Sequence, residues 1–245
     1  MMKPDSLGAY SVGLHLATLP MQKLMGIVNQ VGFSALARMQ HEPERLRHRL
    51  LLAARLLAIV GIPVLWGISA IAPELVPIVL GPKWAVATLP LQLAGLVVPL
   101  RMVSALFNTA VAAVGRASTD LRNTIVTAIV WPGSFAIGAR WEATGLAAAW
   151  LVAIPLTFAL NFPRTSRVLG VHVGTVASAL RAPIGAGILM YAAVAATRLT
   201  LADAMPWLRL GLLVGAGATV YLAIITAMDR SVWHDLRRVI SRESS

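Results

Sequence analysis

The stretch LLAARLLAIVGIPVLWGISAIA, residues 51–72, contains one charged side chain, Arg55, in 22 positions. A bilayer core about 30 Å thick is crossed by roughly 20 apolar helical residues, because backbone polar groups in hydrocarbon must be satisfied within the helix. Six further windows of this kind lie on either side of it, at residues 7–37, 87–114, 121–138, 145–162, 176–196 and 208–228. The sequence therefore predicts an all-α, polytopic membrane helix bundle with about seven transmembrane helices.

The composition excludes an ordinary soluble domain. Hydrophobic residues make up 58% of the chain and charged residues 13%, far from the balance of a soluble globular protein. We expect one transmembrane domain over residues 1–229, followed by a basic cytoplasmic tail over residues 230–245. The first window is too long for a signal-peptide apolar region and contains Pro20, so it predicts a kinked helix that stays in the mature chain.

Arginine is distributed unevenly between the two ends of the predicted spans. The arginine-rich side comprises Arg38, Arg45, Arg47, Arg49, Arg116, Arg122, Arg164, Arg167, Arg181, Arg230, Arg237, Arg238 and Arg242, whereas the other side has mainly Lys3, Lys83, Arg140, Arg198 and Arg209. The positive-inside rule then places the N-terminus in the periplasm and the C-terminus in the cytoplasm. Because residues 1–5 contain nothing that would carry them across a membrane, we expect the chain to be the C-terminal part of a longer transporter.

Polar residues inside two windows predict a binding surface. His15, Thr18, Gln22, Gly26 and Asn29 follow helical spacings and form one stripe on the first window. Lys23 lies about 80° around the helix from that stripe, near mid-membrane, since each residue turns the helix by roughly 100°.

Arg101, Ser104 and Asn108 line up in the same way on the third window. Lys or Arg at the centre of a membrane helix costs roughly 2.5–3.5 kcal/mol, so such residues normally face a hydrated cavity or a partner. The acidic residues lie in loops, at span ends or in tails. We therefore predict that Arg101 and Lys23 line a hydrated cavity that accepts phosphate or pyrophosphate. The alternative is that Lys23 extends to the interface, or that both cations pair with acids of another part of the protein.

Other functional classes lack support in the sequence. The net charge of +11 arises mostly from residues at span ends, where they meet anionic headgroups, so we expect no nucleic-acid partner. We predict no metal site, no cofactor and no catalytic residues, because histidine pairs with ligand spacing, paired carboxylates and nucleotide-binding motifs are missing. Gly185, Gly187, Gly211, Gly215 and Gly217 are typical of close helix packing. The tryptophans are mostly expected as interfacial anchors, namely Trp66, Trp84, Trp131, Trp141, Trp150, Trp207 and Trp233.

Several segments resemble the polysaccharide flippases, the O-antigen and exopolysaccharide export branch of the multidrug, oligosaccharidyl-lipid and polysaccharide exporter superfamily. Residues 7–11 (LGAYS) with Leu19-Pro20 are similar to the family's proline-bent eighth span, and residues 72–84 (APELVPIVLGPKW) to its periplasmic turn. The stretches AVGR at 113–116, GLAAAW at 145–150 and LRAP at 180–183 continue the same order.

The resemblance implies the last seven of about fourteen spans in a transporter of the bacterial inner membrane. It implies export of undecaprenyl-pyrophosphate-linked oligosaccharide for surface polysaccharides such as lipopolysaccharide, with His15 facing the central cavity. The partners would be that lipid-linked sugar, membrane lipids, and a missing N-terminal lobe or a second chain. Alternatives are a drug or cation exporter of the same superfamily, a membrane-embedded glycan-assembly enzyme, and an inactive fragment.

Overall fold

The computed structural model describes residues 33–201 and 205–228, together with residues 8, 11, 12, 14–16, 18, 19 and 22 of the first window. The elements within the two long ranges are α2 (Phe33–Arg38), α3 (Pro43–Val79), η2 (Pro82–Ala87), α4 (Thr88–Ala113), α5 (Ala117–Gly138), η3 (Ala139–Trp141), α6 (Glu142–Leu169), α7 (Val173–Thr200) and α8 (Pro206–Met228). No strand occurs in the described residues, so the predicted all-α membrane bundle is confirmed.

Each predicted window after the first coincides with one of these helices or lies inside it. The helices are mostly longer than the apolar windows, because polar and basic ends continue the helix beyond the hydrocarbon. Within the described residues, five helical segments are long and apolar enough to cross a membrane, and α5 is not among them. Arg122, Asn123 and Thr127 lower the mean hydropathy of α5, although it has 22 residues. Lys23, Asn29 and the tail 230–245 lie outside the described residues.

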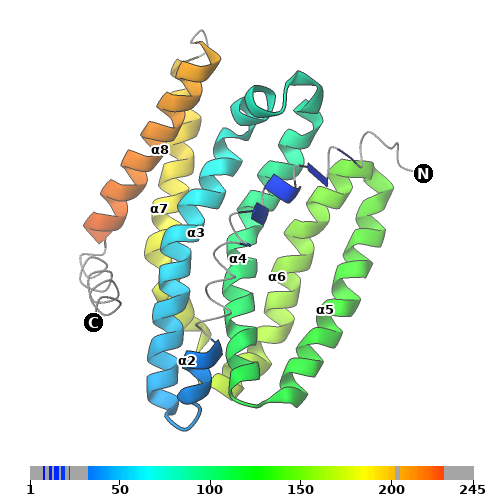
Figure 1. Cartoon of the computed structure of the whole chain (residues 1–245), viewed down its shortest axis with the longest axis vertical. Coiled ribbons are helices and arrows are strands. Elements are labelled where there is room, and N and C mark those ends of the chain that lie inside the picture. The colour runs from blue at the N-terminus through cyan, green and yellow to red at the C-terminus, as the bar shows by residue number, and fades with distance from the viewer. Residues whose placement is uncertain are drawn as a thin grey trace.

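The helices follow one another across the molecule in the order α8, α7, α3, α4, α6 and α5 (Figure 1). Helix α4 lies between α3 and α6, and α5 packs on the far side of α6. The α7–α8 pair packs against α3. This arrangement places the third predicted window, α4, at the centre of the described bundle.

Two tight turns connect these helices through glycines in the left-handed region of backbone space. Gly170 has φ of 64° at the end of α6, where its neighbour Val171 donates a backbone hydrogen bond to the Ser166 carbonyl. Gly115 has φ of 72° between α4 and α5. Glycine adopts this conformation without the Cβ clash that other residues suffer, which explains why both helices end at these positions.

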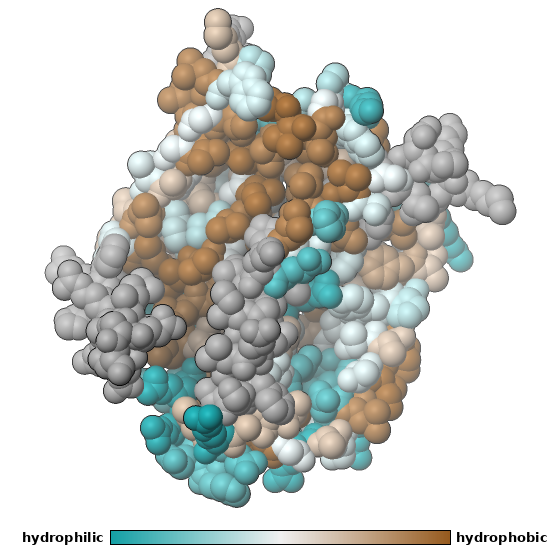
Figure 2. Space-filling view, in the orientation of Figure 1, coloured by the Kyte–Doolittle hydropathy of each residue, from teal (hydrophilic) through white to brown (hydrophobic). Residues whose placement is uncertain are grey.

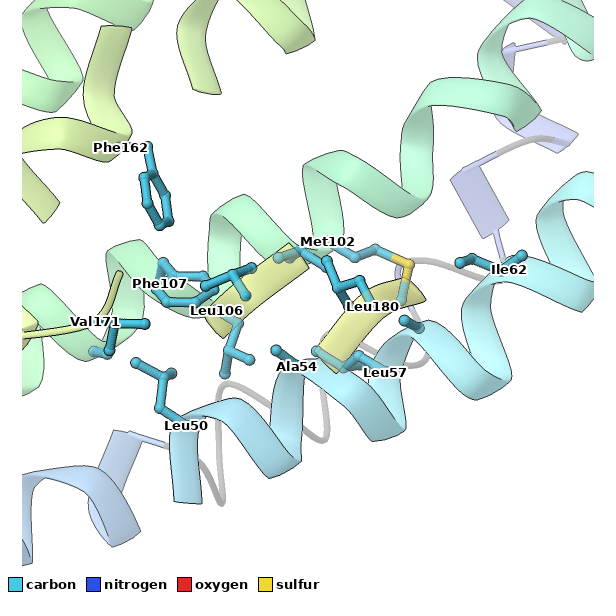
Figure 3. Packing of buried hydrophobic residues seen from close by; sticks show 14 of the residues in the cluster. Leu50, Ala54, Leu57, Ile62, Met102, Leu106, Phe107, Phe162, Val171 and Leu180 are labelled. Atoms are coloured by element: carbon cyan, nitrogen blue, oxygen red, sulfur yellow. The ribbon is translucent and has the colours of Figure 1, made fainter. Parts of the chain in front are cut away.

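The main core lies where α4 packs on α3 and α6, and it continues between α3 and the α7–α8 pair. Leu50 of α3 and Leu106 and Phe107 of α4 are almost fully buried, and the Phe107 and Phe162 rings meet edge to face with centroids 5.8 Å apart (Figure 3). Lipid tails are as apolar as leucine, so this packing stabilises the bundle through close contact rather than through exclusion of water.

The outer surface is apolar along much of the bundle. Large side chains such as Ile129, Val152 and Leu222 remain more than half exposed in the isolated chain. Figure 2 shows hydrophobic residues over much of the visible side of the α3, α7 and α8 region, and hydrophilic residues gathered at the lower end. A lipid-facing surface of this kind is consistent with membrane insertion.

Glu74 joins three helices near the end of α3 that lies opposite the arginine-rich end. The motif resemblance placed it in a turn, but α3 continues past Pro73 and Pro77 and ends at Val79. Its carboxylate accepts hydrogen bonds from Arg198 of α7, at 2.8 and 2.9 Å, and lies 3.2 Å from a guanidinium nitrogen of Arg209 of α8. The side chain of Glu74 is 8% exposed. The ion pairs therefore attach the α7–α8 pair to α3.

The packing role predicted for the glycines is confirmed at two of them. A Cβ on Gly187 of α7 would lie 2.5 Å from Ile62 Cγ2, and one on Gly217 of α8 would lie 3.0 Å from Val194. Gly211 and Gly215 have no neighbouring atom within 4 Å of such a Cβ among the described residues. Glycine at position 187 therefore lets α7 approach α3 closely, and glycine at position 217 lets α8 approach α7 closely.

Candidate functional site

Arg101 lies in the middle of α4, the helix between α3 and α6. Helix α4 has 26 residues, so it is about 39 Å long and Arg101 lies about 20 Å from its start. The side chain is partly buried. None of the ion pairs between described residues includes Arg101. Within the described part of the chain, the Arg101 guanidinium thus makes no ion pair with a carboxylate.

Two tryptophans hold the Arg101 guanidinium. Its central carbon lies 4.9 Å from the ring centroid of Trp131 in α5 and 5.3 Å from that of Trp150 in α6. The two indoles meet edge to face with centroids 5.3 Å apart, and Phe135 packs against Trp150 at 5.5 Å. Trp150 is 6% exposed. The expectation of an interfacial anchor is thus wrong for Trp150, since its ring is used inside the bundle to contact a cation.

A cavity of about 150 Å³ opens beside this cluster, and the predicted residues Arg101, Ser104 and Asn108 all line it. Helix α5 contributes Thr127 and Trp131, and α6 contributes Thr157, Asn161 and Thr165. The Ser104 hydroxyl donates to the Leu100 carbonyl at 2.8 Å. Residues at positions 101, 104 and 108 share one face of α4, which explains why the structure brings them together.

A buried polar network forms the opposite wall of this cavity. The Asn123 side-chain amide of α5 donates to Thr165 of α6 at 3.0 Å, and the Asn161 amide donates to the Thr127 hydroxyl and the Asn123 carbonyl, each at 3.3 Å. Asn123, Asn161 and Thr165 are each less than 9% exposed. The side-chain amide oxygen of Asn161, Oδ1, has no hydrogen-bond partner among the described residues. The network ties α5 to α6 and leaves one acceptor unused.

Sequence reasoning missed this network, although a signal was present. Asn123 and Thr127 are four residues apart, and Thr157, Asn161 and Thr165 repeat the same spacing. Residues four apart lie on one face of a helix. The same rule that identified the stripes on the first and third windows would have found two further polar stripes.

Arg101 also lines a second cavity, of about 310 Å³, on its other side. This cavity is lined by His15 and Gln22 of the first window, together with Ser11 and Thr18, and by Trp150. His15 and Gln22 are exposed. Of the seven residues predicted to bind substrate, the structure therefore groups four, His15, Gln22, Ser104 and Asn108, around Arg101, whereas Lys23 and Asn29 lie outside the described residues.

The combined site offers one permanent cation, several hydroxyl and amide groups, and aromatic walls. Within the described residues, no group of three or more histidines or carboxylates has the geometry to hold a metal ion. Neither cavity is lined by an Asp or Glu of the described residues. Such a surface is suited to binding an anion, because the guanidinium edges can donate to phosphate oxygens while its face stacks on indole.

The fold and site define the chain as a multi-pass helical membrane protein with a cationic, polar cavity between its helices. Among solved structures, the chain is similar to the lipid II flippase MurJ in an inward closed conformation, with a TM-score of 0.66 and 12% identity. The similarity covers 91% of this chain and 48% of that chain. At this level of identity the comparison establishes the fold.

Sequence comparisons point to polysaccharide biosynthesis. A family described as "Polysaccharide biosynthesis protein" matches residues 1–89. The chain is 26% identical over 157 residues to an "Uncharacterized membrane protein in cps region" of Klebsiella pneumoniae. It is 33% identical over 96 residues to the lipopolysaccharide biosynthesis protein WzxC of Escherichia coli strain K12. These stretches cover 64% and 39% of this chain but 32% and 20% of the two relatives. The resemblance to polysaccharide flippases is thereby confirmed over the compared part.

Proposed function

We propose that this chain forms part of a transporter that moves polyprenyl-diphosphate-linked oligosaccharide from the cytoplasmic to the periplasmic leaflet of the bacterial inner membrane. The observation that carries the proposal is Arg101, which lies in mid-helix between two cavities and has no acidic partner among the described residues. The names of the similar proteins, in polysaccharide biosynthesis and lipid II flipping, support the same substrate class.

The physical task of such a transporter is to lower the cost of taking a charged headgroup through hydrocarbon. A diphosphate in lipid has lost its hydration, so it needs fixed cations and hydrogen-bond donors along its path. In this proposal Arg101 binds the diphosphate, and His15, Gln22, Ser104 and Asn108 offer polar contacts to it or to the first sugar. The sequence predicts Lys23 and Asn29 as further substrate-binding residues, and both lie outside the described residues.

The transport cycle in this proposal requires a facing wall that moves relative to the described bundle. The matched part corresponds to 48% of the MurJ chain, and a second helical lobe, in the same or another polypeptide, would supply that wall. Rocking of the two lobes would expose the cavity to each leaflet in turn. By the positive-inside rule, the start of α3 and the end of α6 face the cytoplasm.

Glu74 bears on the alternative of a cation-coupled drug exporter. Such transporters use an intramembrane carboxylate to carry a proton or sodium ion. Glu74 is buried within α3, but Arg198 and Arg209 neutralise it. Within the described residues, the carboxylate of Glu74 is therefore engaged in ion pairs between helices. This favours export of a lipid-linked glycan over export coupled to a proton or sodium ion on Glu74.

The proposal is tested in the bacterium that encodes the chain by replacing Arg101 with Gln and measuring two quantities. These are surface polysaccharide and lipid-linked oligosaccharide retained in the membrane. We expect Arg101→Gln to lower the first and raise the second, because the headgroup loses its cation. Arg140→Gln, an exposed arginine in η3, is the matched control. Normal export by Arg101→Gln, at normal protein abundance, would remove Arg101 from the mechanism.

A further inference from the structure

A third cavity lies away from Arg101, at the arginine-rich end of the bundle. It has a volume of about 630 Å³. Its lining comes from residues 48–55 of α3, residues 178–182 of α7 and the last residue of α8, Met228. Its polar lining consists of His48 and Arg55 of α3 and Ser178 and Arg181 of α7. None of these residues belongs to the site around Arg101, so the cavity requires an explanation of its own.

The position of the cavity along the helices corresponds to the headgroup region. Helix α3 has 37 residues and is therefore about 55 Å long, well beyond a hydrocarbon core of about 30 Å. His48 and Arg55 lie about 8 and 18 Å from its start, at 1.5 Å per residue. In α7, Ser178 and Arg181 lie about 8 and 12 Å from the start. The cavity thus lies at the boundary between headgroups and acyl chains.

The lining combines basic groups with an apolar floor. Arg181 and His48 are exposed, and Leu51, Leu52 and Ala182 supply apolar contact. No Asp or Glu of the described residues lines the cavity. The acids at the start of α3, Glu42 and Glu44, are paired with Arg45 and Arg47. None of the ion pairs between described residues includes Arg181.

We propose that this cavity binds the phosphate of an anionic phospholipid, with the lipid's glycerol and upper acyl chains against Leu51, Leu52 and Met228. A guanidinium donates to two phosphate oxygens at once, and the Ser178 hydroxyl lies on the same face of α7 as Arg181. Basic pockets between membrane helices on the cytoplasmic side favour anionic lipid headgroups for this reason. Arg55 already has an interaction within the chain, so Arg181 is the residue that the experiment replaces.

The bound lipid would connect α3 to α7, because its phosphate would be bound by Arg181 of α7 while its glycerol and upper acyl chains lie against Leu51 and Leu52 of α3. Glu74 makes the corresponding connection at the opposite end of the same helix pair. The α7–α8 pair would then be fastened to α3 by an ion pair at one end and by a lipid at the other. This proposal is independent of the transported substrate.

The proposal is tested by native mass spectrometry of the full chain. The chain is titrated with phosphatidylglycerol or phosphatidylcholine in detergent and then released from the detergent. We expect one phosphatidylglycerol to bind at least about tenfold more tightly than phosphatidylcholine, and Arg181→Gln to remove most of that difference. Arg181→Lys keeps the charge but loses the bidentate geometry, so intermediate binding is expected. Arg167→Gln, an exposed arginine at the end of α6 and outside the cavity, should bind as the unmodified chain does.

Three results would overturn the proposal. The first is equal binding of the two phospholipids, and the second is equal loss in Arg181→Gln and Arg167→Gln. The third is displacement of phosphatidylglycerol by inorganic phosphate or a polyprenyl diphosphate at comparable concentration, since the site would then belong to a different ligand. Because Arg181 is exposed, its replacement is not expected to prevent folding, and Arg181→Lys serves as a second check.

Discussion

Arg101 can be placed at mid-membrane because its guanidinium has two kinds of surface. Its face stacks on the indoles of Trp131 and Trp150, and its edges retain N–H groups for a ligand. Lysine would make the cation–π contact but would not offer a planar donor edge. The tryptophans are therefore positioning residues in this account, since they orient the cation without contacting the diphosphate.

Replacing Trp131 with Leu should weaken binding of a polyprenyl diphosphate about two- to thirtyfold, because a cation–π contact contributes about 0.5–2 kcal/mol. Trp131→Phe should restore much of the affinity, since it keeps an aromatic face. The measurement is the dissociation constant of a fluorescent polyprenyl diphosphate for the purified full chain. Trp207→Leu, at a position 71% exposed, is the matched control. Unchanged affinity in Trp131→Leu would show that the indole does not position Arg101.

At Glu74 a single carboxylate pairs with arginines of two different helices. Glu74→Gln would leave Arg198 and Arg209 without their counter-charge, while the amide keeps part of the hydrogen bonding. We expect a loss of about 1.5–3 kcal/mol in stability, seen as a lower melting temperature in detergent. Glu44→Gln removes an ion pair whose carboxylate is 85% exposed and should cost less than about 1 kcal/mol. Equal melting temperatures for the two variants would contradict the role of Glu74.

Some residues of the site follow from sequence spacing, and others do not. Arg101, Ser104 and Asn108 were identified because positions three, four and seven apart share a helix face. Trp150 was assigned to the interface because tryptophan favours that region, and here tertiary packing against Arg101 overrides the preference. Asn161 does not stand out in the sequence as Arg101 does, because its side chain carries no charge. Its position opposite Thr127 depends on how α5 meets α6.

At the scale of the element, apolar windows predict where helices lie better than where they end. Helix α3 begins eight residues before the predicted window 51–72 and ends seven residues after it. The additional residues include Arg45, Arg47 and Glu74, which are charged and therefore fall outside a window chosen for its apolar residues. The family resemblance placed Pro73 and Pro77 in a turn, yet α3 continues through both prolines to Val79, because a membrane helix tolerates proline where other groups satisfy the freed carbonyls.

The contact between α3 and α7 depends on Gly187. A Cβ there would lie 2.5 Å from Ile62 and 2.8 Å from the Trp66 ring, so Gly187→Ala should force the helices apart and lower the melting temperature. Gly211→Ala in α8 is the control, because its added methyl would have open space around it among the described residues. The control should be neutral or slightly stabilising, since alanine favours helix. A Gly187→Ala variant as stable as Gly211→Ala would show that this crossing is not tightly packed.

At the scale of the whole molecule, the polar cavity lies on the α4–α5–α6 side and the basic cavity between α3 and α7. The six apolar windows after the first predicted the order of the long helices α3 to α8 but not which of them are neighbours. Neighbours are set by small residues and polar contacts such as Gly187 and Asn123, whose partners are distant in sequence. The resemblance to flippases supplied the fold, and the similarity to MurJ confirms it.

We propose above all that Arg101 binds a diphosphate, and the most direct test is the affinity of the purified full chain for a polyprenyl diphosphate. Arg101→Gln, Arg101→Lys and the exposed control Arg140→Gln are compared with the unmodified chain by fluorescence titration. We predict at least about tenfold weaker binding for Arg101→Gln, intermediate binding for Arg101→Lys and no change for Arg140→Gln. Equal affinity in Arg101→Gln and the unmodified chain would contradict the central claim.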